Sequence, residues 1–149
     1  MDVHRKIFGD HFNFCYLNDN NINIDKVYNY WIEASERDFK TMQHLFEAKD
    51  FHWALFIGHL VIERLLKAII VRKTKAHAPH PHDLRRLAKI TGIKFHKEHL
   101  DWFDTITTFN LNARYDSYKH DFYKKCNEDF TIRWINNIKA LRKWIKEKQ

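Results

Sequence analysis

A chain of 149 residues with 44% hydrophobic residues fits one globular domain. Only three glycines and two prolines interrupt it, which favours long helices over many short strands. Two cysteines are too few for a disulfide framework, no secretory signal is recognisable, and no apolar run approaches the ~18 residues of a membrane helix. We therefore expect a protein of the reducing cytoplasm with no membrane partner.

The chain is basic, with 26 Lys and Arg against 19 Asp and Glu and a net charge of +7 at pH 7. The excess is concentrated in residues 64–89 and from Thr131 to the C-terminus. An acidic partner such as RNA, DNA or an acidic protein is one explanation. A lysine excess that keeps the protein soluble is the other, and the sequence leaves both open.

Residues 1–25 differ from the rest of the chain. A polar, turn-rich run over 18–23 has poor helix propensity. The residues before it are too apolar for a free tail. We expect an N-terminal arm over 1–25 that packs on the body or on a neighbouring subunit, followed by one helical domain over 26–149. The apolar residues of this arm include Ile7, Phe8, Phe12, Phe14, Tyr16 and Leu17.

Two long helices are predicted next. Asp25 is a candidate N-cap for a helix over about 26–49, and a short turn separates it from a second helix over about 51–75. The second helix is apolar on nearly every face, so we expect neighbours on several sides. Gly58 in its middle costs about 1 kcal/mol relative to Ala, which indicates a close helix crossing.

A stiff His- and Pro-containing connection leads to a short helix that opens at His82 or Asp83 and ends at Thr91-Gly92. Another long helix over about 97–113 precedes a broken segment over 114–125, and the last helix starts near Asp129. The predicted fold is all-α, an antiparallel up-and-down bundle of four long helices plus a short helix.

Polar residues interrupt two of the predicted apolar faces. His59, Glu63 and Lys67 are spaced four apart and share one face of the second helix, and Asp38 lies in the apolar stripe of the first. Buried charges are costly unless they are paired or face a cleft. Lys67 alone is best explained by a surface pair with Glu63. The row together with Asp38 is better explained by a shared polar seam.

Arg114 and His120 follow the helix over 97–113. A guanidinium binds phosphate with a forked set of donors, and a histidine exchanges protons near neutral pH. RNA cleavage by attack of a 2′-hydroxyl needs both groups. The alternative is a structural or phosphate-binding Arg114 with His120 on the surface, and both interpretations stay open.

Four short motifs occur in order along the chain: Trp31-x2-Ala34-x2-Arg37-Asp38-Phe39, His59-x3-Glu63-x3-Lys67-Ala68, His82-Asp83-Leu84-x2-Leu87 and Asn112-Ala113-Arg114-Tyr115. Their order and spacing resemble the HEPN domain (higher eukaryotes and prokaryotes nucleotide-binding), over about residues 27–146. The resemblance implies an all-helical bundle, usually dimeric. Many members of that family are metal-independent ribonucleases with an arginine, four to six residues and a histidine. Others are non-catalytic, and many stand beside a small nucleotidyltransferase in toxin–antitoxin pairs.

The resemblance makes Arg114 and His120 the candidate catalytic residues. Active members usually have Asn, Asp or His directly after the arginine, whereas this chain has Tyr115. The Ala-Arg-Tyr form resembles the branch whose nuclease activity is least certain, often paired with nucleotidyltransferases. The candidate binding or supporting residues are Asp38, His59, Glu63, Lys67, His82 and Tyr115.

Three functions remain open: an RNA- or nucleotide-binding module in a toxin–antitoxin or defence-type system with a nucleotidyltransferase partner, a metal-independent endoribonuclease, or a non-catalytic protein-interaction subunit. Tyr115 favours binding without robust catalysis. A homodimer with its interface near 114–120 is expected, from the resemblance and from the abundance of aromatic residues on the helices.

Five histidines invite a metal site, but no Cys or Asp cluster completes a tetrahedral set of ligands. We therefore expect no metal and no other cofactor. Cys126 is expected to be an inert thiol, and Trp102 or Trp134 is a candidate for a dimer contact or for base stacking. The histidines are His77, His80, His82, His96 and His99.

Overall fold

The computed structural model describes residues 22–149, which form six helices and no strand. This confirms the predicted all-α fold. Of the N-terminal arm predicted over 1–25, residues 1–21 lie outside the described residues, and Ile24 and Asp25 already belong to the first helix. No helix within 22–149 is long and apolar enough to cross a membrane.

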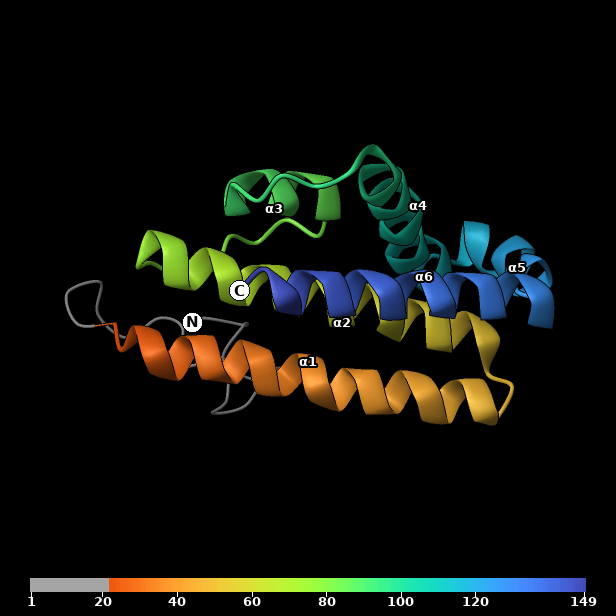
Figure 1. Ribbon diagram of the computed structural model, residues 1–149. Coiled ribbons are helices and arrows are strands. Elements are labelled where there is room, and N and C mark those ends of the chain that lie inside the picture. Colours follow the sequence, from red (N-terminus) through yellow and green to blue (C-terminus); the bar gives the residue numbers. More distant parts are fainter. Residues whose placement is uncertain (1–21) are drawn as a thin grey trace, which may run out of the picture.

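Helices α1 (Ile24–Glu47) and α2 (Phe51–Thr74) form a long antiparallel pair (Figure 1). Asn23, and not Asp25, caps α1: its Oδ1 accepts a hydrogen bond from the Lys26 backbone N–H at 3.0 Å. Asp25 instead lies in the first turn, where its charge complements the positive end of the helix dipole.

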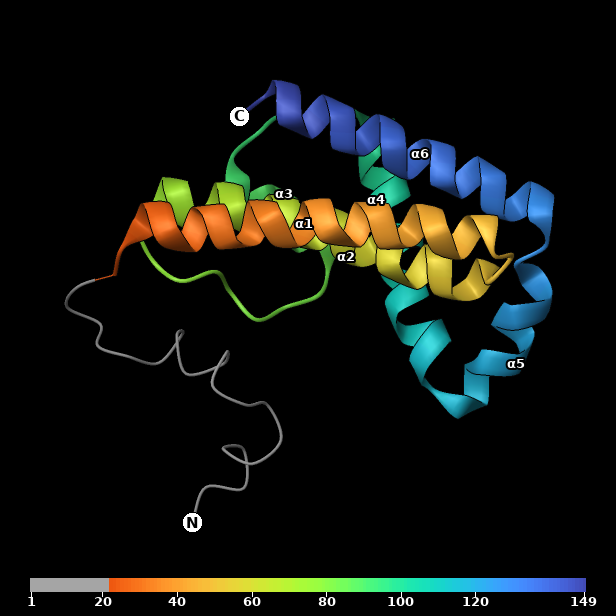
Figure 2. The ribbon, with the colours of Figure 1, turned by 90° about the horizontal axis from the view of Figure 1, so that it is seen from below.

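Helix α2 is the centre of the molecule, because it packs against every other helix. Helix α6 (Glu128–Glu147) runs beside it in the same direction, and α3 (Leu84–Thr91) and α4 (Lys97–Arg114) lie on the side away from α1 (Figures 1 and 2). This central position buries the apolar residues that α2 carries on nearly all of its faces.

Gly58 marks a close crossing of α1, α2 and α6, as predicted. A Cβ atom at this position would lie 2.5 Å from Ile138 Cδ1 and 3.1 Å from Met42 Sδ. The missing side chain therefore allows α2 to approach both neighbours.

The prediction of a broken segment over 114–125 was wrong, because Asp116–Lys125 forms a helix, α5. Tyr115 alone is extended, with φ −94° and ψ 124°, and it both ends α4 and precedes α5. Phe122 is the only buried residue of α5, and its ring packs on Phe109 at 5.6 Å. One buried side chain in ten leaves almost no periodic signal in the sequence.

Two minor predictions have opposite outcomes. Trp134 is buried and its ring contacts Phe109 at 5.6 Å, so of the two candidates for a dimer contact or base stacking Trp134 was wrong. Cys126 is buried, and burial raises the pKa of its thiol to about 12, which agrees with an inert thiol.

Candidate functional site

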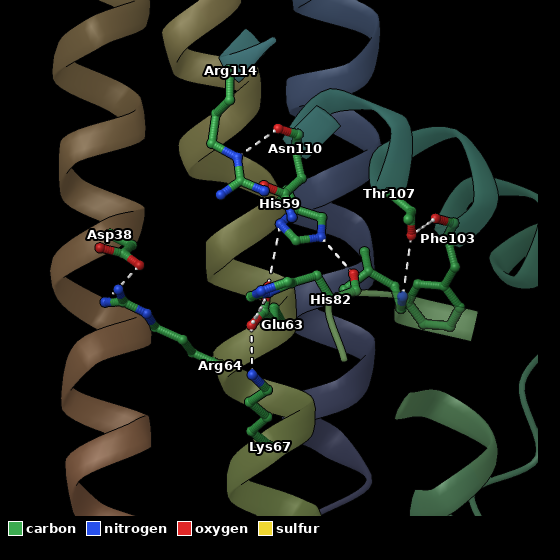
Figure 3. A network of polar contacts seen from close by, with 11 residues as sticks. Asp38, His59, Glu63, Arg64, Lys67, His82, Phe103, Thr107, Asn110 and Arg114 are labelled. Atoms are coloured by element: carbon green, nitrogen blue, oxygen red, sulfur yellow. Dashed lines mark hydrogen bonds and ion pairs between the residues drawn. The ribbon is translucent and has the colours of Figure 1, made fainter. Parts of the chain in front are cut away.

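The polar row of α2 lies inside the molecule. His59, Glu63 and Lys67 are each no more than 5% exposed. The i,i+4 spacing stacks them along one face of α2, which is covered by α1 and by the connection between α2 and α3 (Figure 3). Lys67 is therefore part of a buried pair, and the prediction of a surface pair was wrong.

Glu63 is the acceptor at the centre of this row. Lys67 Nζ donates to its Oε1 at 2.7 Å, and His82 Nδ1 lies 3.1 Å from both carboxylate oxygens. Burial raises the pKa of Glu63, but Lys67, His59 and His82 together outweigh burial, so the pKa is lowered below its ordinary value. Glu63 is thus a buried carboxylate, and its charge is balanced mainly by Lys67. The Lys67 ammonium also lies 5.4 Å from the centre of the Trp31 ring.

The contacts of His59 determine its tautomer. Its Nε2 lies 2.9 Å from the His82 carbonyl oxygen, which only accepts, so Nε2 carries the proton. Burial is the main cause that lowers the pKa of His59, and it keeps the ring neutral at pH 7. Its Nδ1 lies 3.5 Å from Glu63 Oε2 and has no hydrogen-bond partner within residues 22–149.

The connection between α2 and α3 is attached to the row through His82. This residue accepts from His59 through its carbonyl and donates to Glu63 through its ring. Two residues later, the Leu84 N–H donates to Thr107 Oγ1 on α4 at 3.1 Å (Figure 3). The start of α3 is therefore fixed to both α2 and α4.

Asp38 belongs to a separate ion pair beside the row. Its Oδ2 lies 2.9 Å from Arg64 Nη1 (Figure 3). Burial raises the pKa of Asp38, against the opposing effect of Arg64, and the nearby charge of Glu63 raises it further. The charge of Glu63 thus affects the pKa of Asp38, but no hydrogen bond joins Asp38 to the row within residues 22–149.

Arg114 approaches the row from the end of α4. Its Nε donates to the Asn110 carbonyl oxygen at 3.1 Å, and its guanidinium turns toward His59 (Figure 3). The positive charge of Arg114 contributes to the lowered pKa of His59, which agrees with this proximity. Among the described residues, the terminal nitrogens of Arg114 make no hydrogen bond or ion pair.

The comparisons with known proteins agree with this architecture. A model of the HEPN domain matches residues 28–148. The chain belongs to the HEPN domain family. A search of curated protein sequences found no match.

Two solved structures are similar to this chain in fold. TT1696 from Thermus thermophilus is 13% identical with a TM-score of 0.69, over 82% of this chain and 98% of that one. ST0689, an archaeal HEPN homologue, is 15% identical with a TM-score of 0.64, over 81% of this chain and 96% of that one. At these identities the likeness concerns the fold alone.

The two residues predicted to act together are placed differently in this HEPN domain. Arg114 joins the row, whereas His120 lies on α5 with an exposed side chain. The side chain of His120 makes no hydrogen bond or ion pair with any residue in 22–149. Tyr115 is 53% exposed and is the single residue between α4 and α5. Joint action of Arg114 and His120 in one cleft therefore stays a prediction.

Sequence reasoning missed two contacts that hold the site. Asn110 fixes Arg114 through its backbone carbonyl, which carries no side-chain signal in the sequence. Arg64 forms an ion pair with Asp38. The only sequence signal for this pair is that Arg64 directly follows Glu63 on α2. The predicted absence of a metal site stays a prediction; within residues 22–149 no group of three or more His, Cys, Asp or Glu is arranged to hold a metal ion.

Some cations of the two basic segments are paired with carboxylates within the fold. Arg85 pairs with Asp104 at 2.7 Å, and Arg142 pairs with Glu36 at 2.6 Å. The number of Lys and Arg residues therefore overstates the cations that are free to bind RNA, although the net charge of +7 is unchanged by such pairs. The cations whose terminal side-chain nitrogens have no partner in the described part of the chain, Arg114 among them, are the stronger candidates for contact with an anion.

Proposed function

We propose that this HEPN domain binds the phosphates of RNA or of a nucleotide through Arg114. The proposal rests on which nitrogens of the Arg114 guanidinium already have hydrogen-bond partners. Its Nε is occupied by the Asn110 carbonyl, whereas the terminal nitrogens have no partner in the described part of the chain. A guanidinium held in this way presents its forked donors to a phosphate with part of its conformational freedom already lost.

The charge of the buried row supports the same proposal. Glu63 is the only carboxylate of the row, and it already accepts from Lys67 and His82. His59 is neutral because burial lowers its pKa. The row as a whole therefore carries almost no net charge beneath Arg114, so the positive charge of the guanidinium stays available to an anion.

A homodimer is part of the proposal. Three large side chains beside Arg114 are about half exposed: Leu111 at 48%, Tyr115 at 53% and Tyr118 at 52%. Contiguous exposed apolar residues often mark protein interfaces. A two-fold axis near them would bring two copies of Arg114 into one shared surface. We further propose, from the family, a toxin–antitoxin or defence-type role with a small nucleotidyltransferase as the partner protein.

Binding is tested by fluorescence anisotropy with labelled RNA in EDTA over a series of salt concentrations. Arg114→Ala should weaken binding and reduce the slope of log K against log salt by about one phosphate contact. Arg114→Lys should restore only part of the affinity, because it keeps the charge and loses the fork. Lys139→Ala on α6 is the control with the same change in charge. Equal affinities for Arg114→Ala and Lys139→Ala contradict the proposal.

Ribonuclease activity is the second candidate function, and the unpartnered side chain of His120 favours it. An exposed histidine whose side chain has no hydrogen bond or ion pair in residues 22–149 is available for proton transfer. The test is incubation with total RNA in EDTA. If the domain cleaves, His120→Ala should abolish cleavage and leave RNA binding largely intact. If the domain only binds, the unmodified protein leaves the RNA whole, as Tyr115 in place of the usual polar residue leads us to expect.

A further inference from the structure

An open groove lies away from the Arg114 site, between α3 and the beginning of α4. Its volume is about 470 Å³. It is lined by residues of α3, of the connection that follows Gly92 and of the first turn of α4. Both helices lie on the side of the molecule opposite α1 (Figure 1). This size falls in the range of small ligand and peptide side-chain pockets.

The floor of the groove is apolar and mostly aliphatic. Ala88, Ile93 and Leu100 line it together with one aromatic residue, Phe95. The Phe95 ring is already in contact with Phe103 and Trp144, each with ring centres 5.0 Å away. A nucleobase gains most from a free aromatic face, which this packed ring offers poorly. The floor therefore suits branched aliphatic side chains better than a base.

The rim of the groove is positively charged. Arg86 and Lys89 line it one helical turn apart, and neither has a hydrogen bond or ion pair from its side chain within residues 22–149. The third cation of the groove, Arg85, is neutralised by Asp104. Asp83 caps α3, where its Oδ1 accepts from the Arg86 backbone N–H at 3.1 Å, and it is the one carboxylate among the lining residues, against three cations. Two unpaired cations thus border an aliphatic floor.

We propose that this groove docks a segment of a partner protein in which aliphatic side chains are followed by Asp or Glu. The aliphatic groups fill the floor, and the carboxylates meet Arg86 and Lys89 at the rim. The charges are complementary, and complementary charge at a rim sets partner choice and association rate. This site is separate from Arg114, so the inference does not depend on the proposed function.

The test is a titration of the full ¹⁵N-labelled chain, followed by amide chemical shifts. The probe is the acetylated and amidated peptide Leu-Glu-Leu-Glu, and its counterpart Leu-Lys-Leu-Lys is the charge control. We expect saturable shifts at Ala88, Lys89, Ile93 and Leu100 with the acidic peptide, with Kd on the order of 1 mM, and none there with the basic one. The double variant Arg86→Glu/Lys89→Glu should weaken binding about tenfold or more. Lys139→Glu should leave it unchanged.

Three results overturn the proposal. The first is the absence of groove shifts with the acidic peptide at about 10 mM, ten times the expected Kd. The second is equal binding of the basic peptide. The third is a titration with AMP in which the nucleotide shifts the same amides and displaces the peptide, which assigns the groove to nucleotides instead. Loss of RNA binding in Arg114→Ala with intact peptide binding separates this site from the proposed phosphate site.

Discussion

Replacing Lys67 with methionine leaves the buried carboxylate of Glu63 without its main counter-charge. The two side chains have similar length, and the variant removes the ammonium group that donates to Glu63 Oε1 at 2.7 Å. Loss of one partner from a buried ion pair typically costs about 3–5 kcal/mol, because the other charge stays buried without compensation. His82 still donates to Glu63. We therefore expect the lower end, a loss of about 3 kcal/mol in the free energy of unfolding.

The loss should depend on pH in a defined direction. In the unmodified protein the pKa of Glu63 is lowered, so the carboxylate stabilises the fold above its ordinary pKa of 4.5, and this stabilisation is lost as the pH falls through the lowered value. In Lys67→Met burial dominates and the pKa of Glu63 rises. Protonation then relieves the buried charge, so the difference between the two proteins is largest at neutral pH and shrinks as the pH falls.

Urea unfolding followed by circular dichroism measures both effects, at neutral pH and at about pH 4.5, the ordinary pKa of a glutamate. The double variant Glu63→Gln/Lys67→Met removes both charges and should recover more than half of the loss. Lys139→Met, on the exposed face of α6, is the matched control and should change stability by less than about 0.5 kcal/mol. A loss below about 1 kcal/mol at neutral pH, or one of equal size at both pH values, would refute the reasoning.

Three further outcomes follow from the packing. Gly58→Ala should destabilise the fold by about 1–3 kcal/mol in thermal unfolding, because its Cβ would lie 2.5 Å from Ile138 Cδ1, and Ile138→Val should reverse part of the loss by removing that atom. Cys126 should react with Ellman's reagent only after unfolding, in a variant without the other cysteine, because burial raises its pKa from 9.0 to about 12; fast reaction of the native protein contradicts this. Asn127→Ala should cost about 1 kcal/mol in urea unfolding, because its Oδ1 caps α6 through the Phe130 N–H at 2.9 Å, and an unchanged midpoint would argue against the cap.

The helices that sequence reasoning located best have strong local signals. The turn at Lys49 and the end of α3 at Gly92 were both predicted, and both residues have positive φ in the structure. Helix α5 was missed because its fold depends on tertiary contact: Phe122 packs on Phe109, while the other residues of α5 are exposed or partly exposed. Periodicity detects a helix with an apolar stripe, and α5 has a single buried residue.

The site was predicted in part for a similar reason. The four-residue spacing of the row put its side chains on one face of α2, which is a local property. Whether that face is buried depends on what covers it. For Lys67 the cover includes the ring of Trp31 from α1, and for Glu63 it includes His82 from the connection after α2. No pattern within α2 reports these neighbours, so the surface pair was the reasonable but wrong expectation.

His59 links three segments that are far apart in the sequence. Its ring lies on α2, its Nε2 donates to the carbonyl of His82 after α2, and the guanidinium of Arg114 at the end of α4 lies beside it. A proton on Nδ1 would place a like charge next to Arg114, and burial opposes that proton by lowering the pKa of His59. The His59 ring that binds the α2–α3 connection through Nε2 is therefore kept neutral by its burial. Arg114 can then stay folded back over α2 near neutral pH, with its terminal nitrogens available to a phosphate.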